Sequence, residues 1–157
     1  MKVALLSDTH GFLRSEVLER ISDVDRIVHA GDIGPPELLA ELEAVAPVLA
    51  VWGNTDGFDI RERVPEVAAD TFDGQRIVVL HGHQLGSPTP EAVAAEHLDA
   101  DLVVFGHTHR PVIRRVGEVL AVNPGSCGQR RFNIPPTLVL ARIGNEGIET
   151  ELVELEG

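Results

Sequence analysis

The stretch LVVFGHTHRP, residues 102–111, joins a short apolar run to two histidines. The four apolar residues before the glycine are typical of a buried strand, and the glycine is typical of its end. His107 and His109 come directly after that end, separated by one residue. The stretch therefore predicts a strand that delivers two imidazoles to one edge of a sheet. The ends of the other apolar runs indicate which side chains lie beside those imidazoles.

The first third of the chain alternates apolar runs of strand length with segments whose apolar residues have helical spacing. We expect strands at 2–8, 26–32 and 47–54, and helices at 15–21 and 35–45. Such alternation predicts βαβ units that share a parallel sheet.

The rest of the chain is expected to contain more antiparallel pairing. Hairpins are predicted at 66–83, 112–122 and 137–155, and a helix at 89–98. The dipeptide Asp73-Gly74 is a strong hairpin-turn signal within the first of these. Because no repeat, low-complexity segment or polar linker divides the sequence, we expect a single domain over residues 1–157. We expect an α/β sandwich with two mixed sheets at its centre and helices outside.

Composition excludes several classes of function. The formal charge is −12, from 25 acidic and 13 basic residues, and such a surface repels nucleic acid polymers and anionic membranes. The single cysteine, Cys127, has no partner for a disulfide or a zinc–thiolate site, so nitrogen and oxygen must hold any metal. No apolar run is long enough for a signal sequence or a membrane span, which makes a cytoplasmic protein the expectation.

Five apolar runs end in side chains that can bind metal, in LLSDTH, IVHAGD, AVWGN, VVLHGH and VVFGHTH. Ligands of open α/β sheets bind outside the carboxyl ends of the strands, so these groups are expected to share one crevice. Residues two apart at a strand end project to the same side, which pairs Asp8 with His10 and His107 with His109. Nearby glycines are expected to let the backbone approach the bound group. They are Gly31, Gly53, Gly82 and Gly106.

The candidate ligands are carboxylates, an amide and imidazoles. They are Asp8, His10, Asp32, Asn54, His81, His107 and His109. One of these histidines alone would more often be a surface or core group, but seven such residues from five strand ends favour a metal site. One ion cannot use them all, whereas two ions roughly 3.5–4 Å apart that share a carboxylate can. Mixed nitrogen and oxygen ligation suits manganese, iron, nickel or zinc.

In order along the chain, SDTHG, HAGDIG, WGNTD, LHGHQ and FGHTHRP resemble the signature of the calcineurin-like metallophosphoesterase superfamily. The resemblance is closest to its small single-domain bacterial and archaeal phosphodiesterases, and it spans residues 7–126. It implies a four-layer αββα sandwich, the metallo-dependent phosphatase fold. It also implies two divalent transition-metal ions, Mn²⁺ above all, with Ni²⁺, Fe²⁺ or Zn²⁺ as alternatives. The implied reaction is hydrolysis of a small-molecule phosphate ester, principally a diester.

The resemblance also implies a role for each ligand. Asp8, His10 and His109 would hold one ion, and Asn54, His81 and His107 the other. Asp32 would bridge the two ions and, with Asn54, count among the catalytic residues. A hydroxide between the ions would attack phosphorus in line.

Thr55 departs from the pattern of the superfamily. Many members have a histidine after the asparagine ligand, where it is thought to protonate the leaving group. Here Asp56, His83 or a metal-bound water could substitute, or the enzyme could prefer esters with acidic leaving groups. We assign His83 to the catalytic set.

Two further segments are ambiguous in the sequence. NPGS, residues 123–126, resembles a segment near the site of the small phosphodiesterases, but it could be a simple turn. Arg130 and Arg131 could bind a substrate phosphate, although such arginines more often lie on a solvated face. His29, inside an apolar run, is expected to pack in the core or to support a ligand by a hydrogen bond.

The alternative function is a non-catalytic interaction scaffold, because a subunit of the eukaryotic retromer coat has the implied fold. The complete ligand set favours the enzyme. A metallo-β-lactamase site would require His-x-His-x-Asp-His, and HTHRPV lacks the Asp-His pair. The sequence leaves open a homo-oligomer and the natural substrate.

Overall fold

The computed structural model describes residues 1–131 and 133–156. One five-stranded sheet has the order β10-β9-β1-β2-β3. Its members are β1 (Lys2–Leu6), β2 (Arg26–His29), β3 (Val48–Ala50), β9 (Thr137–Gly144) and β10 (Gly147–Glu154). The three N-terminal strands run parallel, and the β9–β10 hairpin joins β1 antiparallel. The predicted βαβ start and antiparallel end are both confirmed.

The second five-stranded sheet has the order β4-β5-β6-β8-β7. Its members are β4 (Val67–Phe72), β5 (Gln75–Leu80), β6 (Leu102–Val104), β7 (Val112–Val116) and β8 (Val119–Asn123). The three inner strands are parallel, and β4 and β7 are antiparallel edges. Asp73 and Gly74 form the β4–β5 turn with φ of 45° and 85°, as their hairpin signal predicts.

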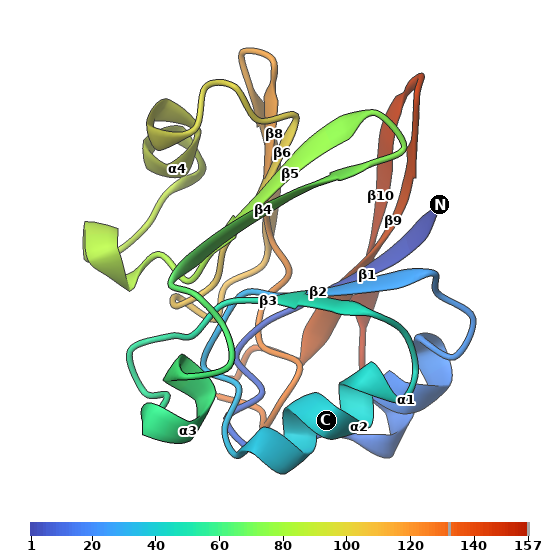
Figure 1. The fold of residues 1–157 in the computed structure, drawn as a ribbon, viewed down its shortest axis with the longest axis vertical. Coiled ribbons are helices and arrows are strands. Elements are labelled where there is room, and N and C mark those ends of the chain that lie inside the picture. Colours follow the sequence, from blue (N-terminus) through green and yellow to red (C-terminus); the bar gives the residue numbers. More distant parts are fainter. Residues whose placement is uncertain (132, 157) are drawn as a thin grey trace.

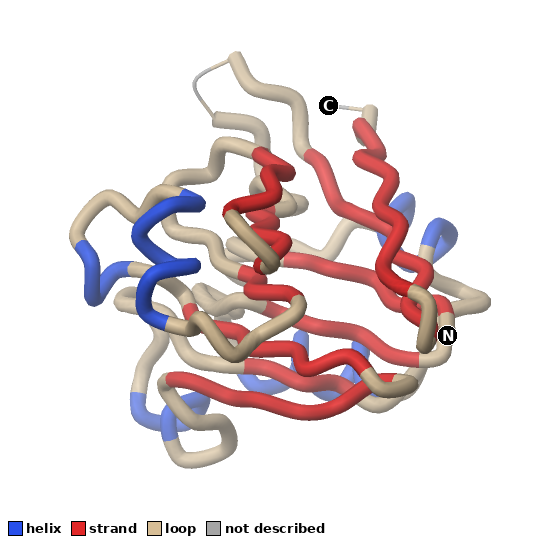
Figure 2. The backbone as a smooth tube through the Cα atoms, turned by 90° about the horizontal axis from the view of Figure 1, so that it is seen from above, coloured by secondary structure: helices blue, strands red, loops and turns tan. Residues whose placement is uncertain are grey.

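Helices cover the outer face of each sheet (Figure 1). Those on the first sheet are α1 (Ser15–Arg20), α2 (Pro36–Glu43) and α3 (Phe58–Arg61), and α4 (Pro90–Glu96) lies on the second. Seen from above, the strands fill the middle of the picture, and helical segments lie at its margins and behind the strands (Figure 2). The sheets thus form the two inner layers of an αββα sandwich, which confirms the expected fold. None of the described helices is long and apolar enough to cross a membrane.

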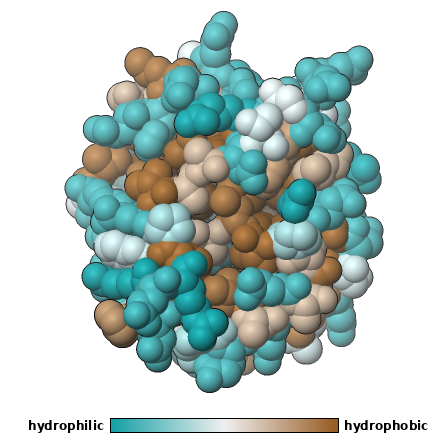
Figure 3. Space-filling model, in the orientation of Figure 1, coloured by the Kyte–Doolittle hydropathy of each residue, from teal (hydrophilic) through white to brown (hydrophobic). Residues whose placement is uncertain are grey.

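The apolar runs are explained by burial on both faces of the strands. In β1, Ala4 and Leu6 pack towards α1 and α2, whereas Val3 and Leu5 pack between the sheets. A strand covered on both faces has no polar face and is continuously apolar. In Figure 3, hydrophobic side chains gather near the middle of the visible face, where β3 and β4 adjoin, and hydrophilic ones surround them.

Two short elements were not predicted from the sequence. The first is the single-turn helix α3, and the second is a 3-10 turn, η1 (His83–Leu85). Elements of three or four residues present too few positions for a helical spacing to be recognised.

Candidate metal centre

The candidate ligands follow the carboxyl ends of β1, β2, β3, β5 and β6, in turns with unusual backbone geometry. Those with positive φ are Asp8 (56°), His10 (47°), Asp32 (55°), His107 (73°) and His109 (61°). Residues other than glycine seldom adopt this conformation, and it persists only where surrounding contacts enforce it. These side chains are therefore aimed by strained turns rather than by the alternation of a strand, which corrects the sequence-based reason for their pairing.

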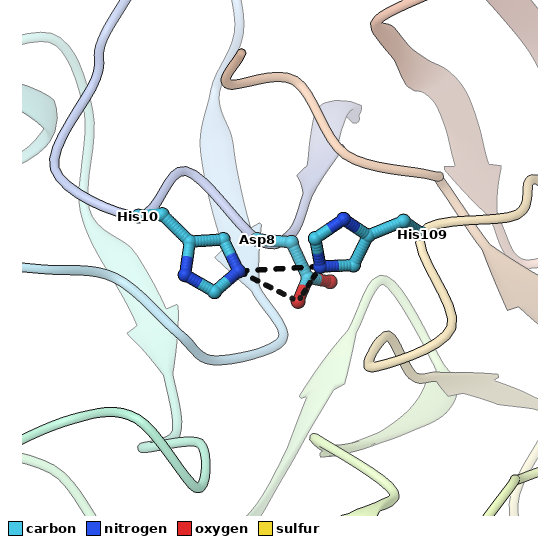
Figure 4. Close-up of side chains that lie close together, drawn as sticks. All are labelled: Asp8, His10 and His109. Atoms are coloured by element: carbon cyan, nitrogen blue, oxygen red, sulfur yellow. Dashed lines mark hydrogen bonds and ion pairs between the residues drawn. The ribbon is translucent and has the colours of Figure 1, made fainter. Parts of the chain in front are cut away.

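Three donor atoms converge from two loops (Figure 4). Nε2 of His109 lies 3.2 Å from Oδ1 of Asp8 and 3.2 Å from Nε2 of His10. Nε2 of His10 lies 3.6 Å from the same carboxylate oxygen. We call Asp8, His10 and His109 the first group.

A second group lies alongside and comprises Asp32, His81 and His107. Nε2 of His81 lies 3.1 Å from Oδ2 of Asp32 and 3.3 Å from Nδ1 of His107. The same Asp32 oxygen lies 3.6 Å from Nε2 of His10, so this carboxylate contacts both groups. His107 and His109, two residues apart, thus face different groups, and the spacing-based expectation that they present a pair of ligands to one place is wrong.

Neighbouring histidines favour the ionised form of both aspartates, although burial opposes it. Burial acts to raise the pKa of Asp8, but contacts with His10 and His109 outweigh it and hold that pKa well below its usual range. For Asp32, burial is likewise outweighed, mainly by His81, and the pKa falls to about 2. Burial opposes protonation of His81, yet Asp32 and Asp8 outweigh it and raise the pKa of this imidazole. A cation bound here would have to displace the proton that these carboxylates stabilise on His81.

The donor atoms fit bound cations. Oδ1 of Asp8 is buried and has no hydrogen-bond partner among the described residues, although a buried carboxylate oxygen normally has one. Atoms that share one ion at about 2.1 Å lie roughly 3–3.5 Å apart, close to the separations within both groups. Within residues 1–131 and 133–156, two sets of carboxylate and imidazole groups could hold an ion: Asp8, His10 and His109; and Asp8, Asp32 and His81.

Asn54 is the one predicted ligand whose side chain makes no hydrogen bond to a described residue. Its side chain is exposed at the rim, on the loop after β3. The backbone beside it is fixed, because the N–H of Thr55 donates a 2.9 Å hydrogen bond to Oδ1 of Asp32. The loop therefore places Asn54 next to the carboxylate that contacts both groups.

His83 lies beside the second group, with its ring centroid 5.5 Å from that of His81. It packs against Trp52 with the ring centroids 5.6 Å apart and the rings tilted by 39°. The guanidinium carbon of Arg61 lies 4.1 Å from the centroid of the Trp52 ring. Burial and the neighbouring His81 lower the pKa of His83. Nε2 of His83 is 3.9 Å from Oε2 of Glu66. Trp52 is half-buried and contacts His83 as well.

Asp56 does not fit the role of a leaving-group acid. Its buried carboxylate accepts hydrogen bonds from the backbone N–H groups of Ile33, Gly34 and Gly53 at 2.9–3.1 Å. Both oxygens thus act as acceptors, and they tie the loop after β2 to the loop after β3. We conclude that Asp56 holds these loops together rather than donating a proton.

Two histidine contacts support the ligands from behind. His29 is buried; its Nδ1 accepts the N–H of Gly31 at 3.1 Å and its Nε2 lies 3.0 Å from Oγ1 of Thr9. It is thus the supporting group that the sequence suggested, and the accepted hydrogen bond fixes the neutral tautomer. Nδ1 of His81 lies 2.8 Å from the carbonyl of Ala30, which directs its other nitrogen towards Asp32.

The glycines near the site serve a different purpose from the one expected. A Cβ at Gly53 would overlap Asp32, and one at Gly106 would overlap Ser7 and Asp8. A Cβ at Gly31 would lie 2.8 Å from Nδ1 of His81. These glycines make room for the candidate ligands themselves. Gly82 is not part of this arrangement, because a Cβ there would meet Pro88.

The NPGS segment supports the site and is more than a turn. The hydroxyl of Ser126 donates a 2.7 Å hydrogen bond to the carbonyl of Asp8, and Asn123 bonds the loop after β6. Cys127 is buried, and burial raises the pKa of its thiol to about 12, which agrees with a structural role. Arg130 and Arg131 are both exposed, and Arg131 lines a small cavity with His109.

The sequence did not mark Ser7 and Thr9 as site residues, and it marked Asn123 only as part of the NPGS segment. Ser7 and Thr9 adjoin the candidate ligand Asp8 in the sequence. The hydroxyl of Thr9 and the amide nitrogen of Asn123 contact residues 15 to 24 positions away, whereas Ser7 donates to Asp8 itself. A position inside a ligand motif is the signal that could have marked Ser7 and Thr9.

Comparisons with known proteins agree with this geometry. Residues 1–146 match the model of the calcineurin-like phosphoesterase superfamily domain. A probable metallophosphoesterase from Methanothermobacter thermautotrophicus is 34% identical, over 98% of this chain and 92% of that protein. A phosphodiesterase from Methanocaldococcus jannaschii is 30% identical, over 89% of this chain and 92% of that protein.

Among solved structures, Vps29 from Chaetomium thermophilum superposes with a TM-score of 0.81 at 18% identity, covering 98% of this chain and 97% of that one. At this identity the likeness shows the fold alone. The match over residues 1–146 and the relatives from archaea carry the assignment further. The chain belongs to the calcineurin-like phosphoesterase superfamily.

Proposed function

We propose that this protein is a metal-dependent phosphodiesterase that hydrolyses small-molecule phosphate esters. The observation that carries the proposal is the buried, unpartnered Oδ1 of Asp8, surrounded by imidazole nitrogens where a cation would satisfy it. The fold alone does not discriminate between an enzyme and an interaction scaffold, because one fold can host both kinds of function. A scaffold, however, has no need for two adjoining groups of ionised carboxylates and imidazoles.

We assign Asp8, His10 and His109 to one ion and Asn54, His81 and His107 to a second, with Asp32 contacting both. Contact of Oδ2 of Asp32 with both His10 and His81 supports the bridging role. The donor set suits Mn²⁺, with Ni²⁺, Fe²⁺ and Zn²⁺ as alternatives.

When bound, the two ions would supply Lewis acidity, lowering the pKa of water towards neutrality and neutralising charge on the phosphoryl oxygens. The chain's own part is positional. Asp32 and the glycine-lined loops fix the donor atoms before substrate arrives, so little reorganisation accompanies the reaction. The loop after β3 brings Asn54 to the rim, where it would contact the phosphoryl group as well as an ion.

We propose that His83 contacts the leaving group and donates a hydrogen bond to its oxygen. Contact with Trp52 holds the ring beside the second group, and Glu66 faces its Nε2. Thr55 cannot act as an acid at neutral pH, and Asp56 is committed to backbone donors. Esters whose leaving groups need little protonation, such as aryl diesters, are therefore the preferred substrates.

Arg131 is the better of the two candidate phosphate-binding arginines, because it lines a cavity with His109. An Arg131→Ala variant is expected to raise KM for a diester, since a guanidinium binds phosphate oxygens through paired hydrogen bonds. An Arg130→Ala variant, made at an exposed neighbour, is the matched control and should leave KM unchanged.

The deciding experiment is hydrolysis of bis(p-nitrophenyl) phosphate by chelator-treated protein with and without Mn²⁺, beside p-nitrophenyl phosphate. Metal-restored cleavage of the diester, lost in an Asp32→Ala variant, is the expected result. Absence of cleavage with Mn²⁺, Ni²⁺, Fe²⁺ and Zn²⁺, together with no stoichiometric metal binding, would contradict the enzyme and favour the scaffold.

A further inference from the structure

Asn123, the last residue of β8, is fully buried beneath the loop that follows β6. Its Nδ2 donates one hydrogen bond to the carbonyl of Gly106 at 3.1 Å and another to Oγ1 of Thr108 at 3.0 Å. Its Oδ1 accepts the N–H of Gly125 at 2.9 Å. Both amide hydrogens of this side chain are thus used on one loop.

The two anchored residues alternate with two candidate ligands. His107 and His109 both have positive φ, a conformation that needs enforcement by neighbouring contacts. Their imidazoles diverge, because His109 contacts Asp8 at 3.2 Å whereas His107 contacts His81 at 3.3 Å. A single loop therefore serves both groups, and its conformation determines whether the two imidazoles can face different ions.

We propose that Asn123 is a positioning residue for both halves of the candidate metal centre. Its two N–H groups hold positions 106 and 108 against β8, so that His107 and His109 are held towards separate ions. This inference rests on the proposed function. It predicts that loss of this anchor weakens the binding of both ions, because one loop carries a ligand for each of them.

The contribution of the amide can be separated from packing. Asn123→Asp is nearly isosteric and keeps an acceptor for Gly125, but it replaces the donating NH2 with an oxygen that faces the Gly106 carbonyl. Thr108→Val removes one of the two acceptors at a partly exposed position, and Thr108→Ser restores it. Asn145→Asp, in the exposed β9–β10 turn, makes the same chemical change far from the site.

The test is titration of the metal-free full-length chain with Mn²⁺, followed by calorimetry for affinity and by electron paramagnetic resonance for spin coupling between two ions. Loss of supporting hydrogen bonds behind metal ligands typically costs about 10–100-fold in affinity. We expect Asn123→Asp and Thr108→Val to weaken both ions at least about 10-fold and to reduce the coupled signal. Thr108→Ser and Asn145→Asp should match the wild type.

The inference would be overturned if both Asn123→Asp and Thr108→Val kept wild-type affinity, or if they lost one ion only. Either result counts when the wild type binds two ions. Wild-type protein that binds no ion would overturn the proposed function and this inference together. Circular dichroism of the metal-free variants checks folding, and if Asn123→Asp does not fold, Thr108→Val alone decides.

Discussion

The hydroxyl of Ser7 donates a 2.5 Å hydrogen bond to Oδ2 of Asp8, which leaves Oδ1 facing the imidazoles of His10 and His109. Both oxygens are buried, so the carboxylate cannot rotate without leaving one partner unsatisfied. The serine before the first ligand thus selects which oxygen is offered to a cation.

Replacement of Ser7 by alanine should therefore weaken the binding of an ion at the first group more than the binding at the second. The carboxylate would keep one contact on Oδ2, the N–H of His107 at 3.2 Å, and would gain freedom to rotate. We expect roughly a 10-fold loss of Mn²⁺ affinity at one of two sites, measured by calorimetry on the metal-free chain. Ser87→Ala, at an exposed serine, is the matched control. Equal weakening of both ions would contradict this role.

Gly106→Ala should disrupt the centre by steric overlap. A Cβ at this position would lie within 2.5 Å of Oδ2 of Asp8 and would overlap the hydroxyl of Ser7. Crowding in a packed interior typically costs about 1–3 kcal/mol, and here it also displaces the carboxylate. Denaturant unfolding and metal titration should both register the change.

Gly144→Ala is the control for this prediction, because a Cβ there meets no atom within 4 Å. Its unfolding free energy should change by no more than about 0.5 kcal/mol. Equal stability and metal binding in both variants would show that the space beside Asp8 is not limiting.

The strands were predictable from the sequence because both faces of their inner members are covered. Val3 and Leu5 face one core and Ala4 and Leu6 another, which makes the run apolar throughout. The polar residues after each run then indicated where the candidate site would form. Composition and spacing were sufficient for these features.

The conformation of the loops was not predictable in the same way. Positive φ at Asp8 and His107 depends on contacts with residues about a hundred positions away, such as the bond from His107 N–H to Asp8. Ser126 reaches the carbonyl of Asp8 across 118 positions. Such contacts arise from the packing of the two sheets and leave no periodic pattern in the sequence.

The buried His29 should lower the free energy of unfolding in acid. Burial lowers the pKa of this imidazole from 6.5 to about 4, so the unfolded chain takes up a proton near pH 6.5 and the folded chain only near pH 4. Between these values the unfolded state binds more protons, and the free energy of unfolding falls as the pH falls. This group contributes a loss of about 3 kcal/mol over that window.

The measurement is urea unfolding of metal-free protein between about pH 7 and pH 4, compared with His29→Asn. Asparagine keeps an acceptor for the N–H of Gly31 but does not titrate. The variant should therefore show a shallower dependence of stability on pH. Parallel curves for the two proteins would assign the acid loss to other groups.

Thr55 predicts a dependence of rate on the leaving group. Its backbone N–H is committed to Asp32, and its exposed side chain supplies no acid at neutral pH. The wild type should cleave aryl diesters faster than alkyl phosphomonoesters, and log kcat for a series of aryl diesters should fall steeply as the leaving-group pKa rises. Alkyl monoester rates that match those on aryl diesters would contradict this preference.

Thr55→His tests the same point by adding the missing acid. Histidine keeps the backbone N–H that donates to Asp32, so the new imidazole changes the chemistry at the rim without removing that backbone hydrogen bond. General acid catalysis is worth about 100-fold or more when a leaving group needs a proton and little when it does not. The variant should therefore flatten the dependence on leaving-group pKa, raising kcat for poor leaving groups while bis(p-nitrophenyl) phosphate is unaffected. Thr55→Val, which adds no acid, should keep the steep dependence, and a similar flattening in both variants would trace the effect to loss of the threonine rather than to the proton.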